Sequence, residues 1–272
     1  MDFDYIVADP TGNITVLITS PYTPETRQDM IQEAFDREPS CEQVGFLMSD
    51  SDSDTGLEMM GYEFCGNATL SAAAWHAGTH GLEPGCDAVI TVESSGADEL
   101  LNVHVRRLEE DPEAAPDVLF GGSYFEGTVG MPVPALSTYR GYPLISFEGI
   151  SHLLVPADDF SIPHAEKAVQ EYARELEVSA LGLMLCPDYD ALTSTQPDED
   201  SVSIRPLVYV PDQETLFWEH GCATGSTAAG WYRYMTGGSS HTEIKQPGGI
   251  IRVDVTGGQP MLTGKVIFRS GR

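Results

Sequence analysis

The chain has 272 residues, 41% of them hydrophobic, with 27 glycines and 18 prolines, a composition typical of a globular protein rich in turns and strands. Fourteen basic against 42 acidic residues give a formal net charge of −28, which argues against nucleic-acid partners and against acidic membrane surfaces. No apolar run approaches the roughly 20 residues that cross a bilayer, and Met1–Asp4 lacks the pattern of a secretion signal, so we expect a cytoplasmic protein.

The cysteines are five in number, at positions 41, 65, 86, 186 and 222. Their odd count, long spacings and lack of a CxxC pair do not fit a disulfide scaffold or a zinc ribbon. We therefore expect reduced thiols and no metal site.

In the first half, apolar spacing and turn residues predict a regular succession of strands and helices. The predicted elements are strands 4–8 and 14–19 around the turn Asp9–Gly12, a helix over 24–37, strands 44–48 and 57–62, a helix over about 69–78, and a hairpin of strands 88–93 and 100–106 around Ser94–Gly96.

The second half begins with an acidic loop and continues with a similar mixture. The predicted elements are the loop 109–116, a helix over 161–178, a strand over 180–185, a polar loop over 194–200, a strand over 202–210, a helix over about 224–234, and a hairpin-rich segment ending near 268.

Aligned side by side, the two halves repeat one another. A cysteine followed by small residues and then by an Ala-rich helix occurs at Cys65 and again at Cys222. Each helix is followed by a strand, a glycine turn and another strand. The repeat predicts an N-terminal lobe over 1–125 and a C-terminal lobe over 126–272, with a last strand that can cross back to the first lobe. The active site is expected between the lobes.

A cysteine at a helix start is suited to acid–base chemistry. The partial positive charge of the helix start lowers a thiol pKa, and the first N–H groups can hold a carboxylate. The small polar residues that we expect to cap these helices are Asn67, Thr69, Thr224, Ser226 and Thr227. Two such thiols on opposite faces of a substrate Cα could invert it without any cofactor.

A lone cysteine is more often a buried packing residue than a reactive one. The duplication favours function for Cys65 and Cys222, because a repeated motif that keeps both thiols indicates that both are used. Cys41, Cys86 and Cys186 lack this setting, and we interpret them as core or incidental residues.

The runs Cys65-Gly66-Asn67 and Cys222-Ala223-Thr224-Gly225 resemble the paired cysteine motifs of the diaminopimelate epimerase family, and Thr11-Gly12-Asn13 resembles its N-terminal substrate-binding turn. Within that family the chain is most similar to the histidine racemases of opine-type, staphylopine-like metallophore pathways. The segments that carry this similarity are Cys41–Phe46, Glu63–Thr69, Trp218-Glu219 and Gln246–Gly249.

The resemblance implies an α+β fold of two pseudo-symmetric lobes, each a β-barrel-like sheet around a central helix. It implies a cofactor-independent, homodimeric amino-acid racemase with Cys65 and Cys222 as the acid/base pair, and histidine as the first substrate to test. The substrate-contacting residues that it implies are Asn13, Glu42, Gln43, Gly66, Asn67, Ala223, Thr224 and Gly225. Glu42 would face the imidazole or the α-ammonium group of the substrate.

The chain departs from the family pattern at two places. Ala223 stands where glycine is more common, and Val210-Pro211-Asp212 replaces the Glu-Arg pair of diaminopimelate epimerases, which disfavours a substrate with a second amino-acid group. Arg205 is a candidate for an anionic side chain or a surface ion pair. His152, next to an apolar strand, is interpreted as structural.

Other functions remain open at this point. Diaminopimelate epimerase is the near alternative, and proline racemases use similar thiols. Isomerases of the phenazine-biosynthesis type have this fold but lack the two thiols. A non-catalytic small-molecule binder and a thiol-redox protein are further possibilities, the latter only if two cysteines so far apart in sequence approach disulfide geometry.

Overall fold

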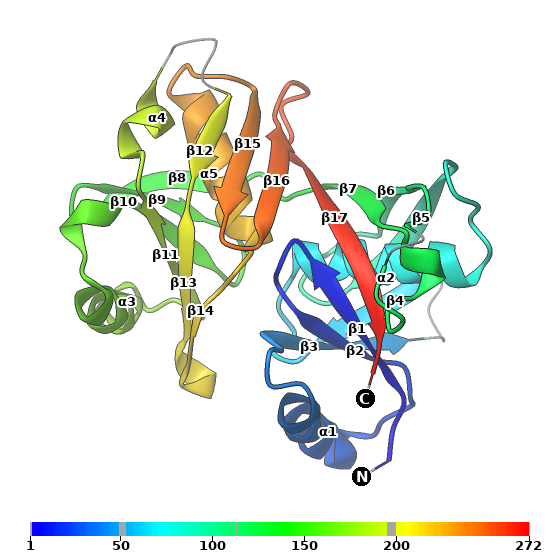
Figure 1. Cartoon of the computed structure of the whole chain (residues 1–272). Coiled ribbons are helices and arrows are strands. Elements are labelled where there is room, and N and C mark those ends of the chain that lie inside the picture. The colour runs from blue at the N-terminus through cyan, green and yellow to red at the C-terminus, as the bar shows by residue number, and fades with distance from the viewer. Residues whose placement is uncertain (1, 49–52, 112–113, 195–199, 272) are drawn as a thin grey trace. The chain divides into compact units, whose positions relative to one another are not determined.

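The computed structural model describes residues 2–48, 53–111, 114–194 and 200–271 (Figure 1). The chain forms two compact units, Met1–Val129 with Thr263–Arg272, and Gly130–Leu262. The sequence analysis divided the chain at 125/126. The division lies after Val129 because strand β7 (Phe125–Gly130) pairs with β6 (Leu101–Arg107) of the first unit.

The first unit is built on an eight-stranded sheet that closes on itself, because β1 pairs antiparallel with both β2 and β17. Figure 1 shows the last strand beside the first one. In spatial order the strands are β1 (Tyr5–Pro10), β2 (Thr15–Ile18), β3 (Gln43–Met48), β4 (Thr55–Met59), β5 (Asp87–Ser94), β6, β7 and β17 (Met261–Ser270). Closure leaves this sheet without a free edge.

Helix α2 (Gly66–Thr79) packs against β1, β4, β5 and β6 of this sheet. Its side chains are mostly alanine, serine and threonine, small enough to fit inside a barrel, and Leu70 is nearly inaccessible. Helix α1 (Pro24–Arg37) has the bounds predicted from sequence. Its inward face, with Met30 and Ile31, packs in a second apolar cluster with Phe46 of β3.

The second unit contains a six-stranded sheet and a three-stranded one. In the six-stranded sheet the strand order is β14 (Thr215–Trp218), β13 (Arg205–Val210), β11 (Leu181–Cys186), β10 (Ser151–Pro156), β9 (Tyr142–Ser146) and β8 (Ala135–Tyr139). In the three-stranded sheet the order is β16 (Gly249–Asp254), β15 (His241–Gln246) and β12 (Ser201–Ser203). Because side chains alternate along a strand, β10 directs Leu153 toward helix α3 (Ile162–Leu176) and Leu154 toward the core around helix α5 (Ala223–Met235). A short helix α4 (Tyr189–Thr193) follows β11.

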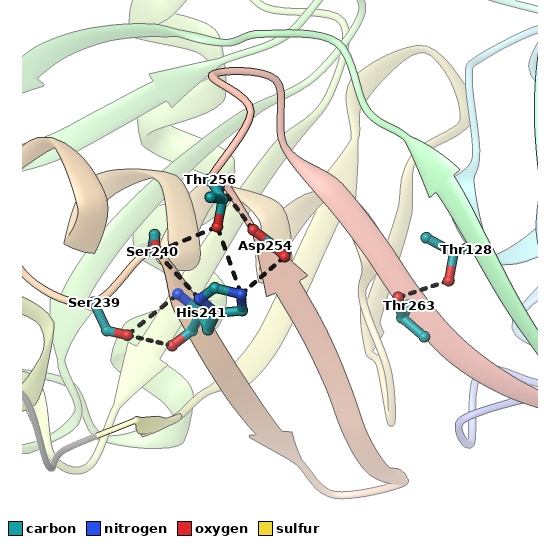
Figure 2. A network of polar contacts seen from close by, with 7 residues as sticks. All are labelled: Thr128, Ser239, Ser240, His241, Asp254, Thr256 and Thr263. Carbon is teal, nitrogen blue, oxygen red and sulfur yellow. Dashed lines mark hydrogen bonds and ion pairs between the residues drawn. The ribbon is translucent and has the colours of Figure 1, made fainter.

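Surface polar contacts fix strand ends in each unit (Figure 2). In the second unit His241 of β15 lies opposite Asp254 of β16, and its Nε2 is 3.0 Å from an Asp254 carboxylate oxygen. The same carboxylate accepts the Thr256 backbone N–H at 2.7 Å. In the first unit the hydroxyls of Thr128 on β7 and Thr263 on β17 are 2.8 Å apart. These contacts hold neighbouring strands in register.

Most predicted elements are confirmed, including the hairpins β1–β2 and β5–β6. The single strand expected over 202–210 was wrong, because the chain breaks at Ile204 and its two parts join different sheets. Strands β7 to β9 and β14 were not predicted, and β10 was expected only as the apolar strand next to His152. The loop expected over 194–200 lies mostly outside the described residues, as do 112–113 of the loop over 109–116.

No helix in the described part of the chain is long and apolar enough to cross a membrane.

Candidate functional site

Cys65 is the N-cap of helix α2, in an extended conformation with φ −129° and ψ 108°. Its Sγ accepts the backbone N–H of Ala68 at 3.5 Å, so the thiol is the group that caps the helix. Its carbonyl accepts both the N–H and the hydroxyl of Thr69, each at 2.9 Å. The peptide around the cysteine is therefore held by the first helical turn.

A chain of side-chain hydrogen bonds leads away from the Cys65 thiol. The thiol donates to Gln43 Oε1 at 3.2 Å, and Gln43 Nε2 donates to Asn13 Oδ1 and, at 2.9 Å, to the Thr15 hydroxyl. Asn13 Nδ2 then donates to Glu42 Oε2 at 2.7 Å. Parallel pairing of β2 with β3 sets Thr15 opposite Gln43, which aligns these groups. The structure thus joins four residues predicted from sequence: Cys65, Gln43, Asn13 and Glu42.

Cys222 repeats this arrangement at the start of helix α5. It is the N-cap, with φ −122° and ψ 111°, and its Sγ accepts the N–H of Gly225 at 3.4 Å. Its carbonyl accepts the N–H of Ser226 at 2.9 Å and the Ser226 hydroxyl at 2.6 Å. The sequence repeat therefore corresponds to a repeat of local geometry: each unit contains one helix that is capped by a cysteine in the same way.

The Cys222 thiol is buried next to a carboxylate. Burial, first, and then the negative charge of Glu219 raise the pKa of Cys222 well above its ordinary value, and the thiol donates a hydrogen bond to that carboxylate. The N–H of Gly225 and the Thr224 hydroxyl act in the opposite direction. The lowered pKa expected from the helix start was wrong for this thiol, because desolvation outweighs the field of the helix.

Three of the five polar residues expected to cap the two helices bond back to carbonyls instead. Thr69 and Ser226 donate their hydroxyls to the cysteine carbonyls four residues earlier, and Thr227 donates to the carbonyl of Ala223. These hydroxyls are directed back to residue i−4 and not to the free N–H groups at the helix start. The caps are the two cysteines.

The remaining predicted substrate-contacting residues lie in the first turns of the two helices. Gly66 and Asn67 follow Cys65 in the first unit, and both are buried. Ala223, Thr224 and Gly225 follow Cys222 in the second unit and are also buried. The N–H groups of a first helical turn have no acceptor within the helix, which makes these positions suited to an anionic group.

The other three cysteines lie away from these helix starts, as free thiols like Cys65 and Cys222. Cys41 is buried and donates to the carbonyl of Gln43 at 2.9 Å, and burial raises its pKa to about 11. Cys186 is buried in the core around α5 and donates to the Met184 carbonyl. Cys86 is exposed. The prediction of core or incidental thiols is confirmed for the two buried ones.

His152 and Arg205, two further candidates from the sequence, lie in contrasting environments. His152 of β10 is fully buried, neither ring nitrogen has a hydrogen-bond partner among the described residues, and burial lowers its pKa to about 3. Arg205 of β13 is exposed, and its guanidinium lies 5.4 Å from the centre of the Trp218 ring. Arg205 therefore stacks on an aromatic surface beside the β13–β14 hairpin.

Glu219 is the residue that sequence reasoning missed as a candidate site residue. The signal was available, since Trp218-Glu219 was one of the segments that resemble the histidine racemases, but nothing in the sequence shows that a carboxylate three residues before Cys222 reaches its thiol. Within the described residues, no group of three or more His, Cys, Asp or Glu side chains is arranged to hold a metal ion.

The geometry can be compared with known proteins. The family model described as histidine racemase CntK N-terminal domain matches residues 2–264. The chain belongs to this histidine racemase family. A family member from Fusobacterium nucleatum, named histidine racemase, is 27% identical over 97% of this chain and 93% of its own. The histidine racemase of Staphylococcus aureus is 25% identical over 90% of this chain and 85% of its own.

Solved structures extend the comparison at the level of the fold. A predicted epimerase from Pseudomonas aeruginosa has a TM-score of 0.63 at 14% identity, covering 99% of each chain. A hydroxyproline epimerase from Agrobacterium vitis, solved with trans-4-hydroxy-L-proline, has a TM-score of 0.58 at 13% identity, covering 99% of this chain and 90% of its own. The α+β fold and the family resemblance drawn from the motifs are both confirmed, and this member of the histidine racemase family is an isomerase of the racemase and epimerase type.

Proposed function

We propose that this chain is a cofactor-independent histidine racemase in which Cys65 and Cys222 are the acid and the base. The observation that carries the proposal is the repeated cysteine cap, with the thiol sulfur on the N–H of the third following residue in both units. Family membership supports an amino-acid racemase, and the names of the relatives support histidine as the substrate.

The chemistry assigns one thiol to each enantiomer. One cysteine, as thiolate, removes the Cα proton, and the other, as thiol, donates a proton to the opposite face, so the sulfur charges are exchanged when the configuration is inverted. Negative charge builds on the substrate carboxylate, and the first-turn N–H groups of α2 and α5 are suited to stabilise it. The mechanism requires both thiols to reach one substrate molecule.

The partners of the two thiols differ in charge. The Gln43 amide oxygen accepts a hydrogen bond from Cys65 without bringing charge, whereas burial and, after it, the Glu219 carboxylate favour the protonated form of Cys222. We propose Cys222 as the resting acid and Cys65 as the resting base, which suits removal of a proton by Cys65 first. Transfer of the Cys222 proton to the substrate leaves a thiolate beside Glu219.

Glu42 is the proposed contact for the cationic parts of histidine. Its Oε2 accepts from Asn13 at 2.7 Å, which orients the carboxylate toward the polar chain that ends at Cys65. A carboxylate in this position would pair with the α-ammonium or a protonated imidazole. Asn13 and Gln43 would hold it in place and contribute amide groups to the substrate.

Diaminopimelate epimerase is the second candidate, and the missing Glu-Arg pair at 210–212 disfavours it.

We further propose that D-histidine serves an opine-type metallophore pathway, which rests on the sequence resemblance to racemases of such pathways. Detection of a D-histidine-derived metallophore in cells with the wild-type protein, and its loss with Cys65→Ser, is the expected result. A metallophore level unaffected by the substitution would contradict this role.

The test of the activity is Cα–H exchange measured by proton NMR in D2O with reduced, cofactor-free protein. The panel contains L-histidine, L,L-diaminopimelate, L-proline, L-glutamate and L-aspartate. Exchange of histidine that is lost or greatly reduced in both Cys65→Ser and Cys222→Ser is expected, whereas the exposed-cysteine control Cys86→Ser keeps full activity. Exchange of another substrate would replace histidine, and full activity in either active-cysteine variant would overturn the two-thiol mechanism.

A further inference from the structure

In each unit a hairpin turn contacts the segment that leads into the cysteine. In the first unit the Ser95 hydroxyl, in the β5–β6 turn, donates to the carbonyl of Glu63 at 3.0 Å. In the second unit the N–H of Gly248, in the β15–β16 turn, donates to the carbonyl of His220 at 2.8 Å. Both carbonyls belong to the residue two positions before a cysteine. The hairpins thus take part in the repeat as supports of the cysteine segments.

The second hairpin adds a contact through Gln246, the last residue of β15. Its Oε1 accepts the backbone N–H of Cys222 at 2.7 Å, and its Nε2 donates to the Ser226 hydroxyl at 2.8 Å. That hydroxyl donates in turn to the Cys222 carbonyl at 2.6 Å. Because the hydroxyl proton is already used toward the carbonyl, the amide must present its N–H to Ser226 and its oxygen to Cys222. One side chain thereby closes a hydrogen-bonded ring around the Cys222 residue.

This ring holds Cys222 on both sides of its Cα. A bond to the N–H restrains φ, a bond to the carbonyl restrains ψ, and together they fix the direction of the Cα–Cβ bond that carries the thiol. The ring leaves Sγ free of Gln246, since Sγ is engaged by Gly225, Thr224 and Glu219. Gln246 therefore acts on the orientation of the thiol through the backbone.

In the first unit a contact from the hairpin also reaches the carbonyl side of the cysteine. The Ser94 hydroxyl, in β5, lies 3.4 Å from the Thr69 hydroxyl, which donates to the Cys65 carbonyl. This contact reaches the carbonyl side of Cys65 through a longer bond than the one from Gln246. Of the two thiols, Cys222 is the more deeply buried.

We propose that Gln246 is a positioning residue for Cys222, and that it sets both the exposure of this thiol and the rate at which it exchanges a proton with the substrate. The second part rests on the proposed racemase function. The first part concerns the thiol alone and is measured without substrate.

The experiment compares Gln246→Met, which keeps the size of the side chain but makes neither bond, with Gln246→Glu, which keeps the acceptor for the Cys222 N–H. Gln170→Met on helix α3 is the matched control, because it makes the same change on a helix that covers the other face of the six-stranded sheet. Thermal melting identifies folded variants. Alkylation of Cys222 and Cys65 by iodoacetamide is followed by peptide mass spectrometry, and kcat and KM are measured for histidine.

In Gln246→Met we expect Cys222 to be alkylated at least about threefold faster because its peptide is released, with the Cys65 rate unchanged. We expect kcat to fall about 10- to 100-fold with KM within about twofold, since a misplaced acid/base group affects the chemical step. Gln246→Glu should recover part of kcat. If Gln246→Met does not fold, Ser226→Ala opens the same ring at the hydroxyl and should shift Cys222 alkylation in the same direction.

The inference is overturned if Cys222 alkylation and kcat in Gln246→Met match those of Gln170→Met. If the wild-type protein is inactive on histidine but Gln246→Met still changes Cys222 alkylation alone, the positioning role holds and the proposed substrate fails. Equal acceleration of alkylation at both cysteines would indicate general loosening of the fold and would also overturn the inference.

Discussion

The carboxylate of Glu219 accepts a hydrogen bond from the Cys222 thiol, and burial together with the negative charge of Glu219 raises the pKa of that thiol. A negative charge beside a buried thiol opposes formation of the thiolate, because two anions at close range are unfavourable where water is excluded. The pair therefore stores a proton on sulfur at neutral pH. This relationship distinguishes the second cysteine from the first, whose thiol faces the neutral amide of Gln43.

Replacing Glu219 by glutamine should lower the pKa of Cys222, since the charge is removed and the size of the side chain is kept. The expected result is a shift of the Cys222 alkylation curve to lower pH. The racemisation rate should fall about 10-fold or more, because Cys222 loses the carboxylate that helps to keep it protonated. Peptide-resolved alkylation at several pH values measures the shift, and Cys65 in the same molecule is the reference. An unchanged Cys222 curve would show that the carboxylate does not control this thiol.

Gln43→Leu should affect both stability and activity. The substitution removes the acceptor of the Cys65 thiol and leaves the buried side chains of Asn13 and Thr15 without their amide partner. A buried polar group that loses its partner destabilises a fold by about 1–3 kcal/mol, and we expect that loss in urea unfolding together with slower racemisation. Wild-type stability in Gln43→Leu would mean that the network is not maintained in solution.

Gly96→Ala tests how closely the β5–β6 turn supports the segment before Cys65. Gly96 has φ +68°, and a Cβ placed on it would lie 2.3 Å from the backbone nitrogen of Phe64. We expect a loss of at least about 2 kcal/mol in the free energy of unfolding, because the contact can be relieved only by moving the turn away from the segment that the Ser95 hydroxyl binds at the Glu63 carbonyl. The control is Gly81→Ala, at φ +84° with open space around it, where about 1 kcal/mol is expected. Equal losses at the two sites would show that steric contact contributes nothing.

The buried imidazole of His152 should make stability fall in acid. Its pKa is about 3 in the folded protein, well below the unfolded value of about 6.5, so only the unfolded chain binds a proton between these limits. Stability is thus complete above the unfolded pKa and decreases as pH falls toward the folded one, by about 2–3 kcal/mol at pH 4.5. Urea unfolding of wild type and His152→Leu at pH 7 and pH 4.5 measures this. Identical pH dependence in the two proteins would assign the acid sensitivity to other groups.

The sequence pattern predicts helices and hairpins well where turn residues mark their ends. Thr23-Pro24 and Pro39 bound helix α1 correctly, because proline favours a first helical turn and cannot continue a helix. Helix α2 begins at Gly66, three residues earlier than predicted. The prediction left these residues out because glycine and asparagine have low helix propensity. Here the cysteine cap and the surrounding barrel determine the helix start, which local propensity does not show.

The candidate site was predicted as a set of residues but not as a set of contacts. Asn13, Glu42 and Gln43 were inferred from family motifs, and the strand register that joins them to Cys65 becomes visible only in the folded chain. The elevated pKa of Cys222 could not be predicted either, because a helix start suggests a lowered pKa and burial is a property of tertiary packing. Charge at Glu219 acts only once the chain brings it to the sulfur.

Strand β17 pairs with β1, so the barrel of the first unit takes one of its eight strands from the end of the chain. While the second unit is synthesised on the ribosome, β1 can pair with β2 but still lacks its other neighbour, β17. The second unit, continuous from Gly130 to Leu262, can fold during that interval. The second unit, although its synthesis begins later, can thus be completed first. The helix that carries Cys65 is fully enclosed by the barrel only after β17 has been made.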